Sequence, residues 1–441
     1  MKMSGVSLYH QGRAFVGALL VALFFVLPAR AVTIQEVVSP KGVRAWLVQD
    51  DFVPLISIRF AFKGGFTQDP AGKEGLGNLM TGLFDEGAGD LPSDAYQERL
   101  DNVGAEMSFS ETSDDIGGSM RMLSENRDAA FDLLALAVNK PRFDQQPIDR
   151  IRQQIIANIK ASERDPSTIA SQKFAEVLYG SHPYARREQG TEQSLMAVTR
   201  EDLQAYHRKV FARDNLTIGV VGAISPQELA PLLDKVFAAL PEKAELTPVP
   251  DAKLALGATT SVSYKLPQTS IALVYPGVAR KDPDFFAAHL MNHILGGGFS
   301  SRLYKEVREK RGLAYSVSSS LINRDHASAL MISTATRPDR AQETLKIIRD
   351  EVSRMASDGP TNEELAAAKS YVIGSYAINN LDTSNGIAQT LVALQQEGLG
   401  RDYIDKRASL IDAVTMDQVK AVAKKLLQAN PAILMVGPAQ M

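Results

Sequence analysis

The chain has 441 residues, of which 45% are hydrophobic and 22% charged, a composition typical of folded globular proteins and long enough for two or three domains. Its 48 basic and 51 acidic residues give a net charge of −3, which does not favour a nucleic-acid-binding surface. The sequence contains no cysteine, which excludes disulfides, thiolate metal ligands and cysteine nucleophiles, so six histidines remain for metal binding or acid–base chemistry.

The first 31 residues have the pattern of a signal peptide. Lys2 and Arg13 precede an uncharged apolar run at 14–27, and Ala29 and Ala31 have the spacing of a signal-peptidase site. The run is shorter than the roughly 20 residues that a membrane-spanning helix needs, which favours cleavage over the alternative of a retained anchor. Cleavage after residue 31 leaves 45 basic and 51 acidic residues, a net charge of −6. We therefore expect an exported, periplasmic chain that does not span a membrane once mature.

The first half of the mature chain, residues 32–240, is predicted to alternate short strands with longer helices. Apolar alternation predicts strands at 46–48, 55–62, 105–109, 117–122 and 216–222. Helical periodicity predicts helices at 75–84, 127–137 and 148–160, and a further helix capped by Thr199. Residues 241–260 combine three prolines with several charges and no periodicity, which predicts a linker.

The second half, residues 261–441, has the same order of elements. Strands are predicted at 270–275, 314–321, 329–334 and 432–437, and helices at 283–295, 300–310 and 363–376 and after the capping residue Thr415. The Thr-capped helix and final strand recur at an offset of 216 residues at the cap and 215 at the strand end. This repeat predicts two homologous α+β domains, 32–240 and 261–441, each a mostly antiparallel sheet with helices on one face.

Three segments resemble the pitrilysin family, which includes insulinase and the mitochondrial processing peptidase. They are residues 62–77, the His182-Pro183-Tyr184 turn and residues 295–317, of which the last is the most specific. The resemblance covers residues 33–440, including the two-half layout. It implies a zinc peptidase fold of two or four homologous α+β domains that enclose the substrate, with this chain forming half of the clamshell.

The resemblance also implies a zinc motif, His-x-x-Glu-His on a helix, with a later glutamate as a third ligand. Aligning residues 75–77 with the start of this motif places Asn78, Thr81 and Gly82 at its three functional positions, and Asn158 stands at the later glutamate. Thr and Gly do not bind zinc usefully, and no base remains to activate water. We therefore expect no metal in this chain and no peptidase activity from it alone, with zinc carried by a homologous partner subunit.

The second half retains Arg308 and Tyr315, separated by six residues. The resemblance implies that an Arg and a Tyr at this spacing reach across the chamber and bind the substrate carbonyl. A guanidinium and a phenol can both donate hydrogen bonds to a developing oxyanion. The alternative is that Arg308 forms a surface ion pair with a nearby helical acid and that Tyr315 lies on a half-buried strand.

A glycine-rich loop precedes this pair and is expected to line the chamber. It lacks the Gly-Lys-Ser/Thr of a phosphate-binding loop, so its glycines favour a tight turn between helices and a close backbone approach to a peptide. Ser300 or Ser301 is predicted to cap the following helix. The predicted substrate-binding residues are Gly296, Gly297, Gly298, Phe299, Ser300 and Ser301.

The remaining candidates favour structural roles. His289 and His293 lie four residues apart on a predicted helix and could share a metal, but no acid lies between them and apolar residues surround them, which favours packed histidines. His182, His207 and His326 are also predicted to be structural. The acidic residues without calcium-loop spacing are predicted to form a solvated rim: Asp85, Glu86, Asp90, Asp114 and Asp115.

Together these features predict a zinc-less subunit of a heteromeric metallopeptidase that supplies Arg308 and Tyr315 in trans for the proteolysis of peptides or unfolded proteins. The substrate is expected to extend a sheet edge, where backbone pairing gives affinity with little sequence demand. The alternative is a catalytically silent peptide-binding or scaffold protein of the same fold. An autonomous hydrolase with a different site is a third hypothesis, but no set of residues supports it, and no Gly-x-Ser-x-Gly elbow is present.

Overall fold

The computed structural model describes residues 33–438. The predicted signal peptide at 1–31 and the last three residues of the chain lie outside these residues. None of the helices in the described range is long and apolar enough to cross a membrane.

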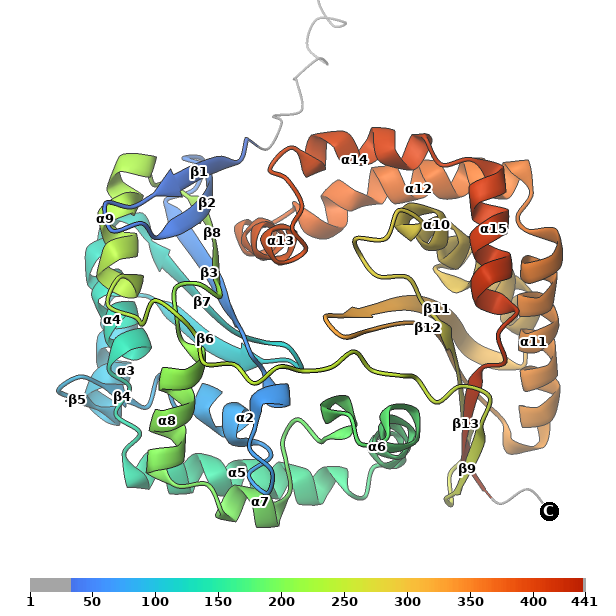
Figure 1. Cartoon of the computed structure of the whole chain (residues 1–441), viewed down its shortest axis with the longest axis horizontal. Coiled ribbons are helices and arrows are strands. Elements are labelled where there is room, and N and C mark those ends of the chain that lie inside the picture. The colour runs from blue at the N-terminus through green and yellow to red at the C-terminus, as the bar shows by residue number, and fades with distance from the viewer. Residues whose placement is uncertain (1–32, 439–441) are drawn as a thin grey trace, which may run out of the picture. The chain divides into compact units, whose positions relative to one another are not determined.

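A six-stranded sheet forms the centre of the first half, in the order β1-β2-β8-β3-β7-β6 (Figure 1). Apart from the parallel pair β2–β8, neighbouring strands are antiparallel. Its strands are β1 (Gln35–Val38), β2 (Arg44–Gln49), β3 (Leu55–Lys63), β6 (Glu106–Glu111), β7 (Asp115–Leu123) and β8 (Leu216–Gly222), and a separate short pair is β4 (Gly87–Ala88) with β5 (Leu91–Pro92).

The helices of this half are α2 (Leu76–Thr81), α3 (Ser93–Asn102), α4 (Arg127–Asn139), α5 (Gln145–Ser162), α6 (Pro166–Tyr179), α7 (Glu192–Met196), α8 (Arg200–Val210) and α9 (Pro226–Phe237). Short 3-10 turns are η1 (Phe66–Gln68), η2 (Ser124–Asn126) and η3 (Pro183–Ala185). Alternate residues of β3, such as Ile58 and Phe60, are buried in the core that α4 and α9 cover. Ser57 and Ala61 point to the opposite face and are buried as well, so both faces of β3 are covered.

A five-stranded sheet forms the second half, in the order β11-β12-β10-β13-β9. Read from β11 to β9, this order repeats the order β6-β7-β3-β8-β2 of the first sheet, with the parallel pair at the same place. Its strands are β9 (Thr259–Ser263), β10 (Thr269–Pro276), β11 (Ala314–Arg324), β12 (Ala327–Thr336) and β13 (Ala432–Gly437).

The helices of the second half are α10 (Phe285–Gly296), α11 (Ala341–Asp358), α12 (Asn362–Asn380), α13 (Ser384–Gln396), α14 (Tyr403–Asp412) and α15 (Met416–Leu427), with the π-helix η4 (Tyr304–Glu309) and the 3-10 turn η5 (Pro338–Arg340). Both predicted Thr caps are confirmed, since Thr199 and Thr415 each form a capping box with the residue three positions later. The predicted α+β fold of two related halves is therefore confirmed, while the domain boundaries themselves stay a prediction.

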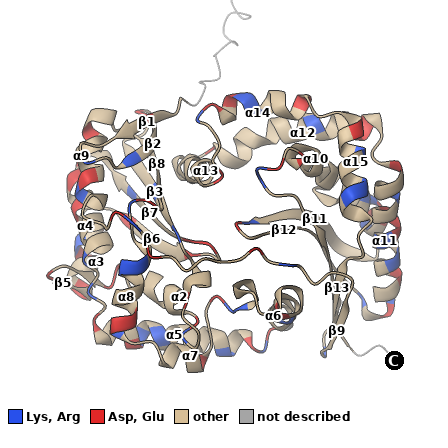
Figure 2. Ribbon diagram, viewed as in Figure 1, with Lys and Arg blue, Asp and Glu red and all other residues tan. Residues whose placement is uncertain are grey.

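Each sheet also receives one helix from the other half, an arrangement that the sequence did not reveal. The uncharged helix α13 packs on β3 and β8, on the face away from the helices of the first half (Figure 2). A Cβ on Gly219 of β8 would lie 2.6 Å from the carbonyl oxygen of Ala388, so a glycine permits this close contact. Reciprocally, Phe174 of α6 is buried in an apolar cluster with Val274 and Leu434 of the second sheet.

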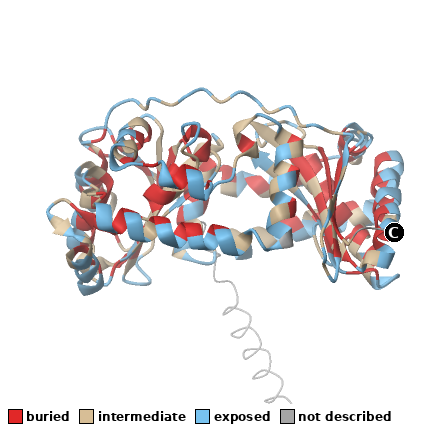
Figure 3. Cartoon of the chain, turned by 90° about the horizontal axis from the view of Figure 1, so that it is seen from below, coloured by how far each residue is buried: buried red, intermediate tan, exposed pale blue. Residues whose placement is uncertain are grey.

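The segment between α9 and β9 has no helix or strand, and its residues alternate between exposed and half-buried (Figure 3). Hydrogen bonds nevertheless fix it along its length. The Gln68 side chain exchanges two with the backbone of Thr247, at 2.7 and 3.0 Å, and the His182 ring bonds the Pro250 carbonyl at 2.7 Å. The predicted linker at 241–260 is thus ordered, and β9 begins inside it, at Thr259.

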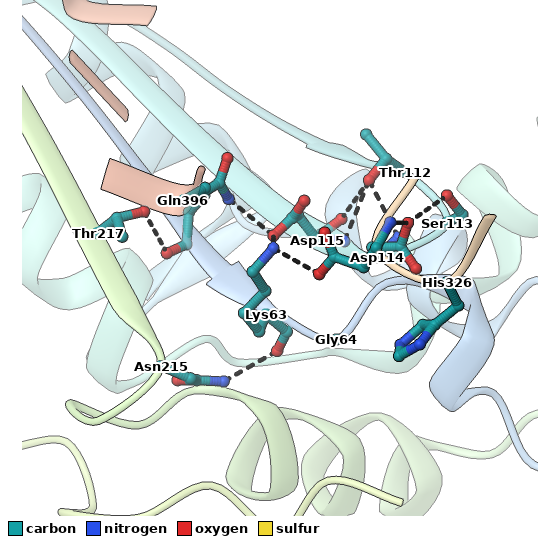
Figure 4. Close-up of polar contacts among 12 residues, drawn as sticks. Lys63, Gly64, Thr112, Ser113, Asp114, Asp115, Asn215, Thr217, His326 and Gln396 are labelled. Carbon is teal, nitrogen blue, oxygen red and sulfur yellow. Dashed lines mark hydrogen bonds and ion pairs between the residues drawn. The ribbon is translucent and has the colours of Figure 1, made fainter. Parts of the chain in front are cut away.

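A polar junction joins the turn of the β11–β12 hairpin to the first sheet (Figure 4). The Lys63 ammonium lies 2.7 Å from Asp325 of the turn and 3.3 Å from Asp115 of β7. Burial raises the pKa of Asp115 to about 6, although Lys63 opposes this shift. The Gln396 amide of α13 donates to Asp115 at 2.7 Å. Asp115 therefore lies in an interface between the two halves and not on the solvated rim that we predicted.

The same junction holds His182 and His326 in place, whereas His207 is held elsewhere in the first half. The Tyr184 hydroxyl donates to Asp114 at 2.7 Å and accepts the backbone N–H of His326 at 3.0 Å. The His182 ring accepts the Tyr184 backbone N–H and caps η3. His207 is buried on α8, where its ring bonds the Val138 carbonyl and burial lowers its pKa to about 4. The predicted structural roles of these histidines are confirmed.

Candidate functional site

Helix α2 carries two of the four positions that correspond to zinc ligands and base, Asn78 and Thr81, and its C-cap residue, Gly82, is a third. Leu79 and Met80 of this helix are buried, and the Thr81 hydroxyl donates a hydrogen bond to the Asn78 carbonyl at 2.8 Å. A Cβ on Gly82 would lie 3.0 Å from the Ile151 side chain of α5. Asn158 lies two helical turns beyond Ile151 and is exposed.

These residues do not fit a zinc ion, because a hydroxyl engaged by the backbone, a glycine and two carboxamides offer neither imidazole nor carboxylate ligands. Within residues 33–438, no group of three histidine or acidic side chains is placed to hold a metal. We therefore derive no metal-dependent step for this chain.

Two buried carboxyl groups lie beside α2, and sequence reasoning missed both. Asp69 accepts hydrogen bonds from the backbone N–H groups of Gly75 and Gly77, at 2.7 and 3.1 Å, yet burial raises its pKa to about 7. Glu111 is also buried, and the nearby Tyr206 hydroxyl only partly offsets the effect of that burial on its pKa. Burial, followed by the charges of Asp69 and Glu188, raises the pKa of Glu111 well above its usual value.

Helix α10 is the counterpart of α2 in the second half, since it follows β10 as α2 follows β3. Its residues 289–293 read His-Leu-Met-Asn-His, where residues 78–82 read Asn-Leu-Met-Thr-Gly. The Leu-Met pair is buried in both helices. His289 and His293 therefore have the spacing of the two histidines in the family's motif, although in the half that was not expected to carry it.

The surroundings of these histidines do not suit a cation. The His289 ring stacks on Phe285, and burial, Arg407, His293 and Arg280 together lower its pKa to about 4. The His293 ring stacks on Tyr371 with 4.7 Å between centroids. The prediction of packed histidines is confirmed, and the pocket that they line is considered below.

The glycine-rich loop follows α10, and its first glycine is required by packing. A Cβ on Gly296 would lie 2.6 Å from the Ser319 hydroxyl and 2.7 Å from its backbone nitrogen on β11. The close approach is therefore to β11, and contact of Gly296, Gly297 or Gly298 with a peptide stays a prediction. Phe299 projects from the loop with 78% of its surface exposed.

The predicted serine cap after this loop is wrong. The Ser301 hydroxyl is buried without a hydrogen-bond partner, and no side chain caps the helix that follows. That helix begins with one α-helical turn and continues as the π-helix η4, in which the Lys310 N–H reaches the Lys305 carbonyl at 2.9 Å. Such π-helical segments often occur at functional sites.

Arg308 and Tyr315 are brought together by η4 and β11. The Arg308 guanidinium lies 4.9 Å from the ring centroid of Tyr304 and 4.7 Å from that of Tyr315. Tyr315 is 80% exposed and lies where β11 shifts register against β12, a bulge of the kind that redirects side chains. Arg308 has no ion pair within the described chain. The alternative of a paired Arg308 and a half-buried Tyr315 is therefore wrong.

An ion pair holds the end of this loop to α12. The Arg302 guanidinium donates to both carboxylate oxygens of Glu364, at 2.8 and 2.6 Å, and to the Gly359 carbonyl at 2.9 Å. In the first half, the buried Glu86 forms an ion pair with the exposed Arg150 of α5 and accepts a hydrogen bond from the Ser93 hydroxyl at 2.6 Å. Glu86 is thus an internal structural residue, and its place on a solvated rim was wrong.

Comparisons with known proteins agree with this architecture. The profile of insulinase (peptidase family M16) matches residues 45–192, and that of the peptidase M16 inactive domain matches residues 197–372. The chain is 30% identical to the crystal structure of a peptidase M16 inactive domain from Pseudomonas fluorescens, with a TM-score of 0.86 over 92% of this chain and 98% of that one. The chain belongs to peptidase family M16.

Curated relatives of this M16 chain have names of two kinds. It is 27% identical to an uncharacterized zinc protease of Streptomyces coelicolor, over 92% of this chain and 90% of that protein. It is 26% identical to the non-peptidase homolog YmxG of Helicobacter pylori, over 86% of this chain and 88% of that protein. The second name describes a family member without peptidase activity, in line with the four replaced positions here.

One of the residues of this M16 site that sequence reasoning missed could have been predicted from the strand pattern. On β6 the side chains of Met107, Phe109 and Glu111 alternate inward, so the strand pattern places Glu111 in the core. Asp69 and the arginines near His289 had no such signal, because loops and separate helices bring them together. At the end of η4 and the start of β11, Arg308 and Tyr315 offer hydrogen-bond donors.

Proposed function

We propose that this chain is the zinc-less subunit of a two-chain M16 peptidase, in which Arg308 and Tyr315 bind the substrate carbonyl at an active site that a homologous zinc-bearing chain provides. The observation that carries this proposal is the free guanidinium of Arg308 between two rings, next to a Tyr315 that is 80% exposed. A guanidinium and a phenol are both hydrogen-bond donors. Because no other side chain of the described residues pairs with Arg308, the two donors are available to bind another molecule.

The surroundings of the pair support the proposal. The Arg302–Glu364 ion pair and the packing of Gly296 on β11 fix the loop and η4, so Arg308 is held on a supported frame. Phe299 and Tyr304, whose rings are 5.2 Å apart, add apolar surface beside the donors. The edge strands β6 and β11 each have one edge with unpaired backbone N–H and C=O groups, along which a peptide could extend. The leader pattern at residues 1–31 supports an exported complex.

The test combines the mature chain with the zinc-bearing M16 chain from the same cell. We expect cleavage of a fluorogenic peptide only with both chains present, and loss of that cleavage with a chelator. Arg308→Ala should lower kcat/KM by about 100-fold and Tyr315→Phe by about tenfold, because each removes a donor to the oxyanion. Arg337→Ala is the matched control, since Arg337 is exposed and pairs only with nearby Asp339.

A second candidate is a catalytically silent peptide-binding or scaffold protein. The similarity to a relative named a non-peptidase homolog favours it. It predicts peptide binding with no cleavage in any mixture, and no effect of Arg308→Ala on a partner's turnover. Unchanged turnover with both Arg308→Ala and Tyr315→Phe would contradict the role in trans and leave the scaffold as the better account.

A further inference from the structure

A pocket of about 440 Å³ lies in the second half beside α10, and the proposed function does not use it. Helices α10, α12, α13 and α14 line it. Its volume is in the range of small-molecule sites. It lies where the counterpart of the family's metal site would be, since His289 and His293 form part of its wall.

Two guanidinium groups dominate the chemistry of this pocket. Arg280 lies 3.0 Å from the Glu397 carboxylate and donates to the Tyr403 hydroxyl at 2.6 Å. Arg407 is only 8% exposed, and within residues 33–438 it has no ion-pair partner. One of its terminal nitrogens donates to the Val372 carbonyl at 3.0 Å. With one carboxylate for two guanidiniums, the pocket has a net charge of +1 while its histidines are neutral.

The other side chains that line the pocket indicate the rest of the ligand. The Arg407 guanidinium lies 4.1 Å from the Tyr376 ring centroid, and the Phe286 and Tyr403 rings also line the cavity. The His289 ring has no hydrogen-bond partner among the described residues, and as a neutral imidazole it can donate one N–H. A buried guanidinium without a counter-ion is costly, and a planar carboxylate matches its fork of donors.

We propose that the pocket between α10, α12 and α14 binds a carboxylate carried on an apolar or aromatic group. Arg407 binds the carboxylate, Arg280 and His289 lie beside it, and the rings pack on the apolar group. One negative charge balances the net charge of the pocket, whereas a metal cation would add to it. The C-terminal residue of a peptide and a free aromatic acid share this chemistry. The site does not involve Arg308 or Tyr315, so it does not depend on the role in trans.

The test is calorimetric titration of the mature chain with N-acetyl-phenylalanine, its amide, inorganic phosphate and a pentapeptide with a C-terminal phenylalanine. We expect the acid to bind at least tenfold more tightly than the amide. Tighter binding of the pentapeptide than of the acid would identify a peptide C-terminus as the ligand, and the reverse would identify a free acid. Equal binding of acid and amide, tighter binding of phosphate, or no binding of any carboxylate would overturn the proposal.

Two variants and a control keep the test independent of folding. Arg407→Met removes the guanidinium and should weaken binding of the acid at least tenfold. Because Arg407 also supports α12 through Val372, Ser375→Trp provides a second variant that fills the pocket from α12 and leaves both arginines in place. Arg337→Met, an exposed arginine outside the pocket, should bind as the parent does. Folded variants of both kinds that retain full affinity would exclude the site.

Discussion

Helices α2 and α10 occupy equivalent places in the two halves, yet acidic groups lie beside α2 and mainly basic groups lie beside α10. Both bury a Leu-Met pair, at 79–80 and at 290–291. Beside α2 lie the buried carboxyl groups of Asp69 and Glu111, whereas two arginines and two histidines surround the pocket at α10. The difference teaches that the fold requires the apolar residues of this helix and leaves its flanking positions free to change their chemistry.

An ion pair beside each helix also shows that the fold can be kept while the chemistry of individual positions changes. Glu86 pairs with Arg150 in the first half, and Arg302 pairs with Glu364 in the second, at offsets of 216 and 214 residues. Both pairs join the segment after the helix to the first two turns of a later long helix, α5 in the first half and α12 in the second. The position is therefore kept as an ion pair, while the acid and the base have exchanged places.

The largest effect should come from reversing one charge of this pair. Arg302→Glu places two acids together in a partly buried site and should lower the free energy of unfolding by about 3 kcal/mol. Adding Glu364→Arg restores the polarity that the first half already uses and should recover more than half of the loss. Urea denaturation of the single and double variants measures this coupling. Additive losses would show that the two halves do not tolerate the same exchange.

A smaller loss should follow a methyl group at Gly77. A Cβ there would lie 1.9 Å from the Glu111 carboxyl oxygen, whereas the equivalent residue of α10, Ala288, carries a methyl in its core. Gly77→Ala should destabilise the chain by about 2 kcal/mol, because the buried Glu111 side chain must move. In a Glu111→Ala background the same change should be neutral or stabilising. A loss of equal size in both backgrounds would mean that Glu111 is not the cause.

These two predictions rest on contacts that the sequence could only partly foresee. The caps at Thr199 and Thr415 and the alternation of β3 were predictable, because they depend on residues a few positions apart. The packing of α13 on the first sheet was not predictable, since the sequence of an uncharged helix does not indicate which sheet it will pack on. The π-helix at η4 and the unpartnered Ser301 were likewise missed, because tertiary packing overrode a local capping signal.

The candidate site was also only partly predictable from the sequence. The replacement of the zinc motif by Asn78, Thr81 and Gly82 could be inferred from a family resemblance along one segment, and so could the pairing of Arg308 with Tyr315. The charge of the α10 pocket was hidden, because Arg280, His289 and Arg407 come from segments more than 100 residues apart at their extremes. Patterns within one element are readable from a sequence, whereas charges assembled from several elements need the fold.

A third prediction concerns the acids beside α2. A carboxyl with a raised pKa in the folded chain binds more protons there than in the unfolded chain, so stability should fall as pH rises from the ordinary pKa toward the raised one. Glu111→Gln should reduce the fall in the free energy of unfolding between pH 5 and pH 8 by about 1 kcal/mol, as measured by urea denaturation at each pH. Glu106→Gln, on the exposed side of the same strand, is the control and should leave the profile unchanged.

The smallest effect concerns the titration of His289, which responds to its burial and to the charges beside α10. Burial, Arg407, His293 and Arg280 lower its pKa to about 4, with Glu397 as the acid of the same pocket. Because the unfolded chain then binds the proton more readily, the histidine favours unfolding only as pH falls through its ordinary value toward 4. In NMR titrations assigned with His289→Gln, the ring should remain neutral at pH 5.5, and Arg407→Met should raise its pKa. Titration near the ordinary histidine value would mean that the counterpart of α2 is not cationic, and the contrast between the two helices would fail.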